Sequence, residues 1–313
     1  MPASFSPLNY TGNKSCIADL ILSVMPPHQV YIEPCMGSAE VFLRKRRVKK
    51  EILNDYDGNL VNFFRVLQDN EKLRYLLGRV ALSVNAEELF HGNRDLLDAV
   101  PNVLDDLAET ERIVESASKE EIDQAAAFLE TQFYSFSSTG QAYGIAVRNI
   151  VTRIPRLIAA NHRLREAAIL HRDYKDAITY GACKGAFIFL DPPYMDTENM
   201  YHNGSFDRAE HERLFALMDE INRKYQGDCK FLITYKAEEE IMAMARECGF
   251  DMWVEKRLHA MRQRAEAGSE FPELLVSNYL LEDQAMDNGY IINPKRQLSL
   301  FDIYEKQEEK NNG

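Results

Sequence analysis

Four consecutive residues, Asp191, Pro192, Pro193 and Tyr194, could together hold a flat ring that carries an amine. The two adjacent prolines fix two φ angles and remove two amide donors, which makes a rigid turn. The Asp191 carboxylate and the Pro192 carbonyl oxygen can each accept a hydrogen bond from an NH₂ group, and the Tyr194 ring offers a face for stacking. The turn therefore predicts a site for a planar ring with an exocyclic amine. The alternative is a structural turn with a packed tyrosine.

An apolar run directly before this turn indicates what positions it. Residues 186–190 are continuously apolar and lie between Gly185 and Asp191. A run without alternation is typical of a central parallel strand that is covered on both faces. Ligands of doubly wound sheets bind at the carboxyl ends of such strands. We therefore expect Asp191 to lie at the edge of a ligand site.

Two further strand ends carry polar residues. Residues 30–32 form a short apolar run that ends in the turn Glu33-Pro34-Cys35-Met36-Gly37-Ser38, and residues 51–54 form a second run that ends at Asp55. A glycine such as Gly37 lets a cofactor approach the backbone closely. An acid at the end of the second strand is placed to reach ribose hydroxyl groups. The two features together favour a cofactor that contains a nucleoside.

Strands alternate with helices along most of the chain, which predicts an α/β fold with a doubly wound sheet. Further strands are expected at 230–235 and 273–279, and helices at 39–46 and from a capped start at Asp207 onward. The sheet would position all of the strand-end residues above.

Changes in this pattern divide the chain into three regions. Residues 68–158 show helical spacing and a helix-favouring acidic stretch, so we expect a mainly helical insert there. The α/β pattern occupies 1–67 and 159–283, which would form the catalytic domain. Residues 284–313 are expected to be a flexible polar tail.

Composition limits the class of protein. The 313 residues include 45% apolar residues but no apolar run long enough to cross a bilayer, and no secretory signal is recognisable. The five cysteines are scattered and never form a Cys-x-x-Cys pair, so neither a metal site nor a disulfide framework is expected. Reduced thiols indicate a cytoplasmic protein.

The net charge of −12 does not by itself favour a nucleic-acid partner, but phosphate binding depends on local basic surface. Residues 44–50 are rich in Arg and Lys, and this run could be either a phosphate contact or a solvated helix face. Residues 148–172 hold six arginines with Glu166 as the only acid. We expect phosphate contact in this second run.

The segment Gly12-Asn13-Lys14-Ser15 resembles the end of a phosphate-binding Walker loop. It lacks the glycine directly before Lys14, and no glycine-rich run precedes it. This departure excludes a nucleotide triphosphatase.

Taken in order, these motifs resemble the Dam-like family of adenine-specific DNA methyltransferases in which the cofactor motifs precede the catalytic one. The resemblance covers about residues 8–282. It rests on Leu8 to Lys14, Tyr31 to Ser38, Leu53-Asn54-Asp55, Asp173-Tyr174, Asp191 to Tyr194, and Leu274 to Tyr279.

The resemblance implies a Rossmann-like methyltransferase domain with a helical target-recognition insert, and S-adenosylmethionine as the cofactor. The residues implied to line the cofactor site are Tyr10, Lys14, Glu33, Pro34, Gly37, Ser38, Asp55, Asp173, Tyr174 and Asp191. The chain departs from the family in two places, because Gly37 is followed by Ser38 and Ala39, and Gly12 is followed by Asn13. Both replacements are small and would at most weaken or alter cofactor binding.

The implied reaction is methylation of the N6 amine of an adenine that is flipped out of duplex DNA. Asp191, Pro192, Pro193 and Tyr194 would form the catalytic turn, and no covalent enzyme intermediate is required. In the insert, the polar stretch 135–144, which includes Ser138, would face the DNA. Arg148, Arg153 and Arg156 would contact the DNA phosphates, which also implies a location at the nucleoid.

The tail contains Gln297-Leu298-Ser299-Leu300-Phe301, which resembles the pentapeptide that binds the DNA polymerase sliding clamp. An apolar island in a polar tail suits a docking peptide in which Gln297, Leu298, Leu300 and Phe301 make the contacts. The alternative is a tail that folds back and buries Leu300 and Phe301 on its own domain.

Two other functions remain open at this point. One is a methyltransferase that acts on RNA or on a protein amide, although Asp191 at the first position of the motif favours adenine. The other is a catalytically degenerate regulator that binds DNA. The recognition sequence, a restriction-modification partner and the oligomeric state are not indicated by the sequence.

Overall fold

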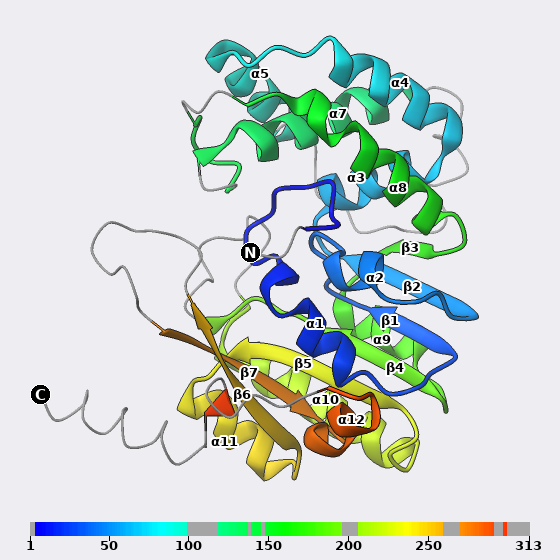
Figure 1. Cartoon of the computed structure of the whole chain (residues 1–313), viewed down its shortest axis with the longest axis vertical. Helices are drawn as coiled ribbons and strands as arrows, with labels where there is room; N and C mark the ends of the chain where they lie inside the picture. The colour runs from blue at the N-terminus through cyan, green and yellow to red at the C-terminus, as the bar shows by residue number, and fades with distance from the viewer. Residues whose placement is uncertain are drawn as a thin grey trace, which may run out of the picture. The chain divides into compact units, whose positions relative to one another are not determined.

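The computed structural model describes residues 4–98, 118–136, 139–144, 148–195, 206–258, 270–290 and 297–298 (Figure 1). The chain divides into two units. The first consists of Met1–Ala18 and Val30–Gly181, and the second of Asp19–Gln29 and Ala182–Gly313. Within the described ranges, no helix is long and apolar enough to cross a membrane, and no group of His, Cys, Asp and Glu could hold a metal ion.

The strands of the first unit are parallel and follow the order β3-β2-β1. β1 spans Val30–Glu33, β2 spans Lys50–Asp55, and β3 spans Ala168–His171. Val30 pairs with Lys50, and Ile52 pairs with Ala168. Side chains on both faces of β2 are buried, as expected for an inner strand of a covered parallel sheet. Parallel pairing brings the carboxyl ends of β1 and β2 to the same edge.

The helices of this unit come from both the α/β part and the insert. They are the 3-10 helices η1 (Lys14–Cys16) and η3 (Ile150–Arg153), and the α-helices α2 (Glu40–Arg44), α3 (Gly58–Gln68), α4 (Asn70–Ala81), α5 (Glu87–Asp98), α7 (Ser118–Tyr134), α8 (Ile154–Leu164) and α9 (Tyr174–Gly181). α3 begins after Asp57 and α4 after Asp69, and each aspartate side chain accepts hydrogen bonds from two amides of the first turn. Such caps stabilise a helix start by about 1 kcal/mol.

The described residues within 68–158 are mainly helical, and α7 packs against α3, α4 and α5 (Figure 1). Phe63 of α3 lies 5.9 Å from Phe128 of α7 between ring centroids. The buried Asn93 side chain on α5 donates to the Glu130 carboxyl on α7 at 2.7 Å. An apolar stripe on each helix faces this contact, which is why the helical periodicity was visible in the sequence.

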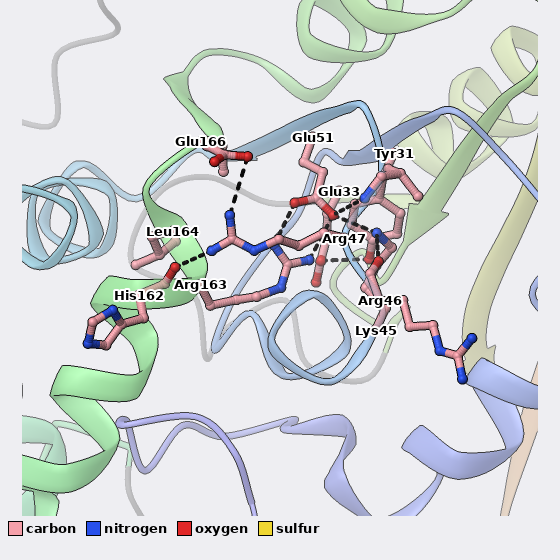
Figure 2. Close-up of polar contacts among 12 residues, drawn as sticks. Tyr31, Glu33, Lys45, Arg46, Arg47, Glu51, His162, Arg163, Leu164 and Glu166 are labelled. Atoms are coloured by element: carbon pink, nitrogen blue, oxygen red, sulfur yellow. Dashed lines mark hydrogen bonds and ion pairs between the residues drawn. The ribbon is translucent and has the colours of Figure 1, made fainter.

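A buried ion network supports β1 and β2 (Figure 2). Glu51 on β2 accepts hydrogen bonds from Lys45 at 2.7 Å and from both terminal nitrogens of Arg163 at 2.5 and 2.7 Å. Burial acts to raise the pKa of Glu51, but the hydrogen bonds from Arg163 and Lys45 outweigh it and hold that pKa below its usual value. The network fixes α8 against β2.

The second unit contains strands in the order β4-β5-β7-β6-β8. They are β4 (Ala186–Leu190), β5 (Lys230–Lys236), β6 (Asp251–Leu258), β7 (Glu270–Ser277) and β8 (Gln297–Leu298). β4 and β5 are parallel, whereas β7 runs antiparallel to both β5 and β6. The helices are α1 (Ala18–Ser23, from Asp19 onward in this unit), α10 (Arg208–Lys224), α11 (Glu239–Glu247) and α12 (Leu281–Asp287).

The predicted α/β fold is confirmed, and most predicted elements lie within a residue or two of the observed ones. The strand predicted at 186–190 is β4, and the helix predicted to start at Asp207 is α10, where the Asp207 side chain caps the Glu210 amide at 2.9 Å. The strand predicted at 273–279 ends instead at Ser277. Directly after this end, the Asn278 side chain accepts a hydrogen bond from the Phe231 amide at 3.0 Å.

The strand β6 and the antiparallel end of the sheet were not predicted. Residues 251–258 mix charged and apolar side chains, and their strand character comes from pairing with β7. β7 follows β6 in the chain but lies between β5 and β6, an order that local pattern does not encode.

Candidate active site

The loop after β1 approaches the end of β2 in the first unit. Gly37 has a φ of 45°, and its amide donates to the Asp55 carboxyl at 2.9 Å. Only glycine adopts this left-handed backbone without strain. A Cβ atom on Gly37 would lie 3.6 Å from Cε1 of Tyr10, so the Tyr10 ring is packed against the loop. The structure therefore brings Tyr10, Gly37 and Asp55 together.

Asp55 is the acid at the end of β2. Its carboxyl accepts from the Gly37 amide and from the Asp57 amide at 3.0 Å. These hydrogen bonds favour the ionised form, yet burial outweighs them and raises the pKa of Asp55 to about 6. The group is therefore ionised at neutral pH and close to its titration range.

Asn54 is a residue of this site to which the sequence analysis gave no role. Its buried side chain donates to the Pro34 carbonyl and to the Arg172 carbonyl, each at 2.9 Å, and accepts from the Arg172 amide at 2.9 Å. It thereby joins the loop after β1 to the segment before Asp173. Asp173 in turn accepts from the Lys175 amide at 2.9 Å at the start of α9, where Tyr174 is buried.

Glu33 takes part in the buried network rather than in the exposed part of the loop. Its carboxyl accepts from the Tyr31 hydroxyl at 2.7 Å and is 2% exposed (Figure 2). Burial is the largest cause of a pKa of Tyr31 well above its ordinary value, and the neighbouring Glu33 adds to it. Ser38, the other small residue of this loop, is also buried.

The segment before η1 is held by a carboxyl group that no sequence signal had indicated. Glu40 at the start of α2 accepts from the Ser4 hydroxyl at 2.6 Å and from the Phe5 and Ser6 amides, each at 3.0 Å. Lys14, the first residue of η1, is buried, and its ammonium group donates to the Gly12 carbonyl at 3.0 Å. Glu40 thus holds residues 4–6, which precede Tyr10 and Lys14 in the chain.

The second unit holds the turn Asp191 to Tyr194, which directly follows β4. The Thr234 hydroxyl on β5 donates to Oδ1 of Asp191 at 2.8 Å. The Tyr194 hydroxyl donates to Oε1 of Glu273 on β7 at 2.6 Å. Pro192 is buried, whereas the side chains of Asp191 and Tyr194 are partly exposed. Each polar side chain of the turn therefore has a buried partner, Thr234 on β5 for Asp191 and Glu273 on β7 for Tyr194.

The two basic runs differ in how their charges are compensated. In the first run, Lys45 binds Glu51 and Arg44 binds Glu40 at 2.6 Å, so these two residues have protein partners. In the second run, Arg163 is likewise paired with Glu51.

Arg148, Arg153 and Arg156 take part in none of the ion pairs formed among the described residues. Arg148 donates to the Phe133 carbonyl at 2.8 Å, and Arg153 lies over the Phe133 ring and donates to Asn9. Burial, together with repulsion from Arg156 and Arg148, lowers the pKa of Arg153 to about 10. This cluster, here called the arginine cluster, is a local positive charge that favours an anion.

The two ends of the polar stretch 135–144, which precedes the arginine cluster in the chain, pair with each other. Ser135 and Tyr143 form an antiparallel bridge, and the Gly144 amide donates to the Tyr134 carbonyl at 2.8 Å. Phe136 is 67% exposed. Ser138, which was expected to face the DNA, lies outside the described residues, as do Leu300 and Phe301 of the tail.

Comparison with known proteins identifies the class. The model of the D12 class N6 adenine-specific DNA methyltransferases matches residues 10–261, and the chain belongs to this family. The match confirms the family predicted from the sequence, and the description of that family is that of an adenine-specific DNA methyltransferase, which implies a methyl donor and a DNA substrate for its members.

A named relative is similar over much of the chain. The DNA N-6-adenine-methyltransferase of Escherichia phage P1 is 24% identical over 258 residues, which are 77% of this chain and 31% of that protein. The chain thus spans about a third of the length of this curated relative.

Proposed function

We propose that this chain transfers a methyl group from S-adenosylmethionine to the N6 amine of a flipped adenine in a specific duplex DNA sequence. The observation that carries the proposal is the turn Asp191 to Tyr194 at the end of β4, with Asp191 bound to Thr234, in a chain that belongs to the D12 family. We propose that this methylation takes place in the cytoplasm, at the nucleoid.

The residues at the ends of β1 and β2 suit the nucleoside part of this cofactor. Gly37 presents backbone without a side chain, and Asp55 offers a carboxylate that could accept hydrogen bonds from ribose hydroxyl groups. The proposed cofactor residues are Tyr10, Lys14, Glu33, Pro34, Gly37, Ser38, Asp55, Asp173, Tyr174 and Asp191. Glu33 would act indirectly, since its carboxyl is bound to Tyr31. Bound S-adenosylmethionine supplies an electrophilic methyl group.

The protein's part in the reaction is to bind and orient the amine. Flipping an adenine out of the duplex costs a few kcal/mol, and stacking on Tyr194, at about 1–3 kcal/mol, offsets part of this cost. The Asp191 carboxylate and the Pro192 carbonyl then accept hydrogen bonds from the amine. Two acceptors favour a pyramidal nitrogen, whose lone pair is less delocalised into the ring. The contribution is positioning and charge complementarity.

Replacement of the turn's acid tests this mechanism. Asp191→Ala should abolish methyl transfer from labelled S-adenosylmethionine to long, PCR-amplified DNA of mixed sequence. Its thermal unfolding should stay close to that of the wild type, because the side chain is partly exposed. Full activity of this variant would contradict the mechanism. If the wild-type protein bound DNA but not S-adenosylmethionine, the result would instead support the alternative function, a catalytically degenerate regulator that binds DNA.

We propose that the insert, residues 68–158, chooses the DNA sequence, while 1–67 and 159–283 form the catalytic domain. The arginine cluster and the loop 135–144, with Ser138, would face the DNA. The two ends of the insert are closed by side chains. Asn161 donates to the Leu67 carbonyl at 2.8 Å, and Gln68 donates to the Leu164 and Ala167 carbonyls at 2.8 and 2.7 Å. Such a closed base suits a separate recognition module.

The tail, residues 284–313, is proposed to bind the sliding clamp through Gln297, Leu298, Leu300 and Phe301. In the structure, Gln297 and Leu298 form β8, which pairs with Glu255 and Val254 of β6. Clamp binding would therefore require these two residues to leave β6. A synthetic peptide of residues 293–306 should bind purified clamp, and a peptide with Leu300 and Phe301 replaced by Ala should not. Equal binding by both peptides, or by neither, would remove the proposal.

A further inference from the structure

Two buried residues on adjacent strands hold the polar side chains of the turn. Thr234 on β5 and Glu273 on β7 are both fully buried. Thr234 pairs with Leu275 and Lys236 pairs with Glu273, so Thr234 and Glu273 are diagonal neighbours on the same face of the antiparallel pair. One hydrogen-bonds to Asp191 and the other to Tyr194.

Thr234 has a single hydroxyl proton, and Oδ1 of Asp191, at 2.8 Å, is a closer acceptor for it than the Leu190 carbonyl, at 3.4 Å. The terminal torsion of an aspartate is otherwise broad. The donor therefore restrains the plane of the carboxyl group and with it the direction of the lone pairs that would accept from the amine.

Glu273 fixes the ring of Tyr194 by its hydroxyl end. The O···O distance is 2.6 Å, and the ring lies 5.9 Å from the Tyr235 ring at an angle of 42°. A phenol has only one proton to donate. Since that proton is directed at Glu273, the Tyr194 hydroxyl is not available as a donor to a bound base. The ring is left to act by stacking.

We propose that Thr234 and Glu273 are positioning residues of the methyl-transfer site. Thr234 sets the orientation of the Asp191 carboxylate, and Glu273 sets the plane of the Tyr194 ring. This inference rests on the proposed function, because the turn must first be the methyl-transfer site.

Thr234 is tested with Thr234→Val, which keeps the shape and removes the hydroxyl, and with Thr234→Ser, which restores it. Loss of a hydrogen bond to a charged group should lower kcat for methylation of the mixed-sequence DNA about ten- to hundredfold. Thr234→Ser should recover kcat to within about threefold of the wild type.

The matched control is Ser277→Ala, which removes another buried hydroxyl from the same sheet. The Ser277 hydroxyl lies on β7, donates to the Tyr279 carbonyl, and is not part of the turn. This variant should keep kcat. If Thr234→Val behaved like Ser277→Ala, or if Thr234→Ser failed to restore kcat, the role of Thr234 would be overturned.

Glu273 is tested by its coupling to Tyr194. Glu273→Leu should lower kcat and raise the KM for DNA about tenfold each, and Glu273→Gln, whose amide oxygen still accepts from the hydroxyl, should recover most of both. In a Tyr194→Phe background, which retains the ring but not the hydroxyl, Glu273→Leu should have a much smaller effect. If Glu273→Leu lowered kcat by the same factor in the Tyr194→Phe background as in the wild type, the role of Glu273 would be overturned.

The proposed function fails separately from this inference. If wild-type protein does not methylate DNA, both are wrong. If wild-type protein methylates DNA, Asp191→Ala is inactive, and Thr234→Val and Glu273→Leu are fully active, only the positioning roles are wrong. Thermal unfolding of each variant shows whether a loss of activity reflects loss of the fold, and the conservative replacements Thr234→Ser and Glu273→Gln then decide the question.

Discussion

Asp55 combines backbone donors, among them the Gly37 and Asp57 amides, with a burial strong enough to raise its pKa to about 6. If its carboxylate accepts from the cofactor's ribose, binding requires the ionised form. The affinity for S-adenosylmethionine should then be constant well above pH 6 and fall as the pH is lowered through 6. The loss at about pH 5 should approach tenfold, the value of one hydrogen bond to a charged group. Calorimetric titration of the wild-type protein across this range measures it.

The control for this titration is Asp55→Asn, which has no proton to gain. Its affinity should be weaker at about pH 8 and should not vary with a midpoint near the pKa of Asp55. A wild-type affinity that does not change between pH 5 and pH 8 would mean that the Asp55 carboxylate does not contact the cofactor.

Single residues were predictable where their type and position both carried information. Asp191 and Tyr194 were found because two prolines and a buried strand accompany them, and Asp55 because it ends a strand. Thr234 and Glu273 were not found, since their partners lie 43 and 79 residues away in the chain. Their roles depend on strand register, which the sequence does not display.

Elements were predictable in proportion to how local their determinants are. β4 is continuously apolar, so its bounds were predicted correctly, and α10 starts at the capping Asp207. α2 was expected to reach residue 46 but ends at Arg44, because Lys45 takes an extended conformation with its side chain directed to Glu51. The order of β6 and β7 depends on long-range pairing, and no local signal revealed it.

The junction of β2 and α8 supplies a stability prediction. Glu51→Gln would leave the buried charges of Lys45 and Arg163 without their carboxylate, and we expect the free energy of unfolding to fall by about 3–5 kcal/mol. Because the pKa of Glu51 is held low in the folded protein, its contribution is present above the unfolded pKa of about 4.3 and is lost as the pH falls through the folded value. Urea unfolding of both proteins at several pH values measures the difference.

An exposed pair provides the comparison for this experiment. Arg223 and Asp219 on α10 form an ion pair in which Arg223 is 73% exposed. Asp219→Asn should change the free energy of unfolding by less than about 1 kcal/mol. A Glu51→Gln protein as stable as Asp219→Asn would show that the buried network does not stabilise the fold.

At the scale of the whole molecule, an acidic chain is proposed to bind a polyanion. A net charge of −12 gives no general attraction to DNA, so binding must depend on a local surface. Among the six arginines of 148–172, Arg163 has a buried carboxylate partner, whereas the three residues of the arginine cluster take part in no ion pair among the residues that the structure describes. The cluster is therefore the part of this run that favours phosphate.

The salt dependence of DNA binding tests whether the arginine cluster contacts phosphates. Each phosphate contact contributes about 0.9 to the slope of log K against log salt concentration. Arg148→Gln and Arg156→Gln should each flatten the slope by about that amount, and a triple variant with Arg153→Gln by up to about three times as much. Arg223→Gln removes one exposed charge outside the cluster and should leave the slope unchanged. Binding of the mixed-sequence DNA at several salt concentrations gives the slopes. If the triple variant kept the wild-type slope, these arginines would not contact phosphate, and sequence recognition would have to come from another face of the insert.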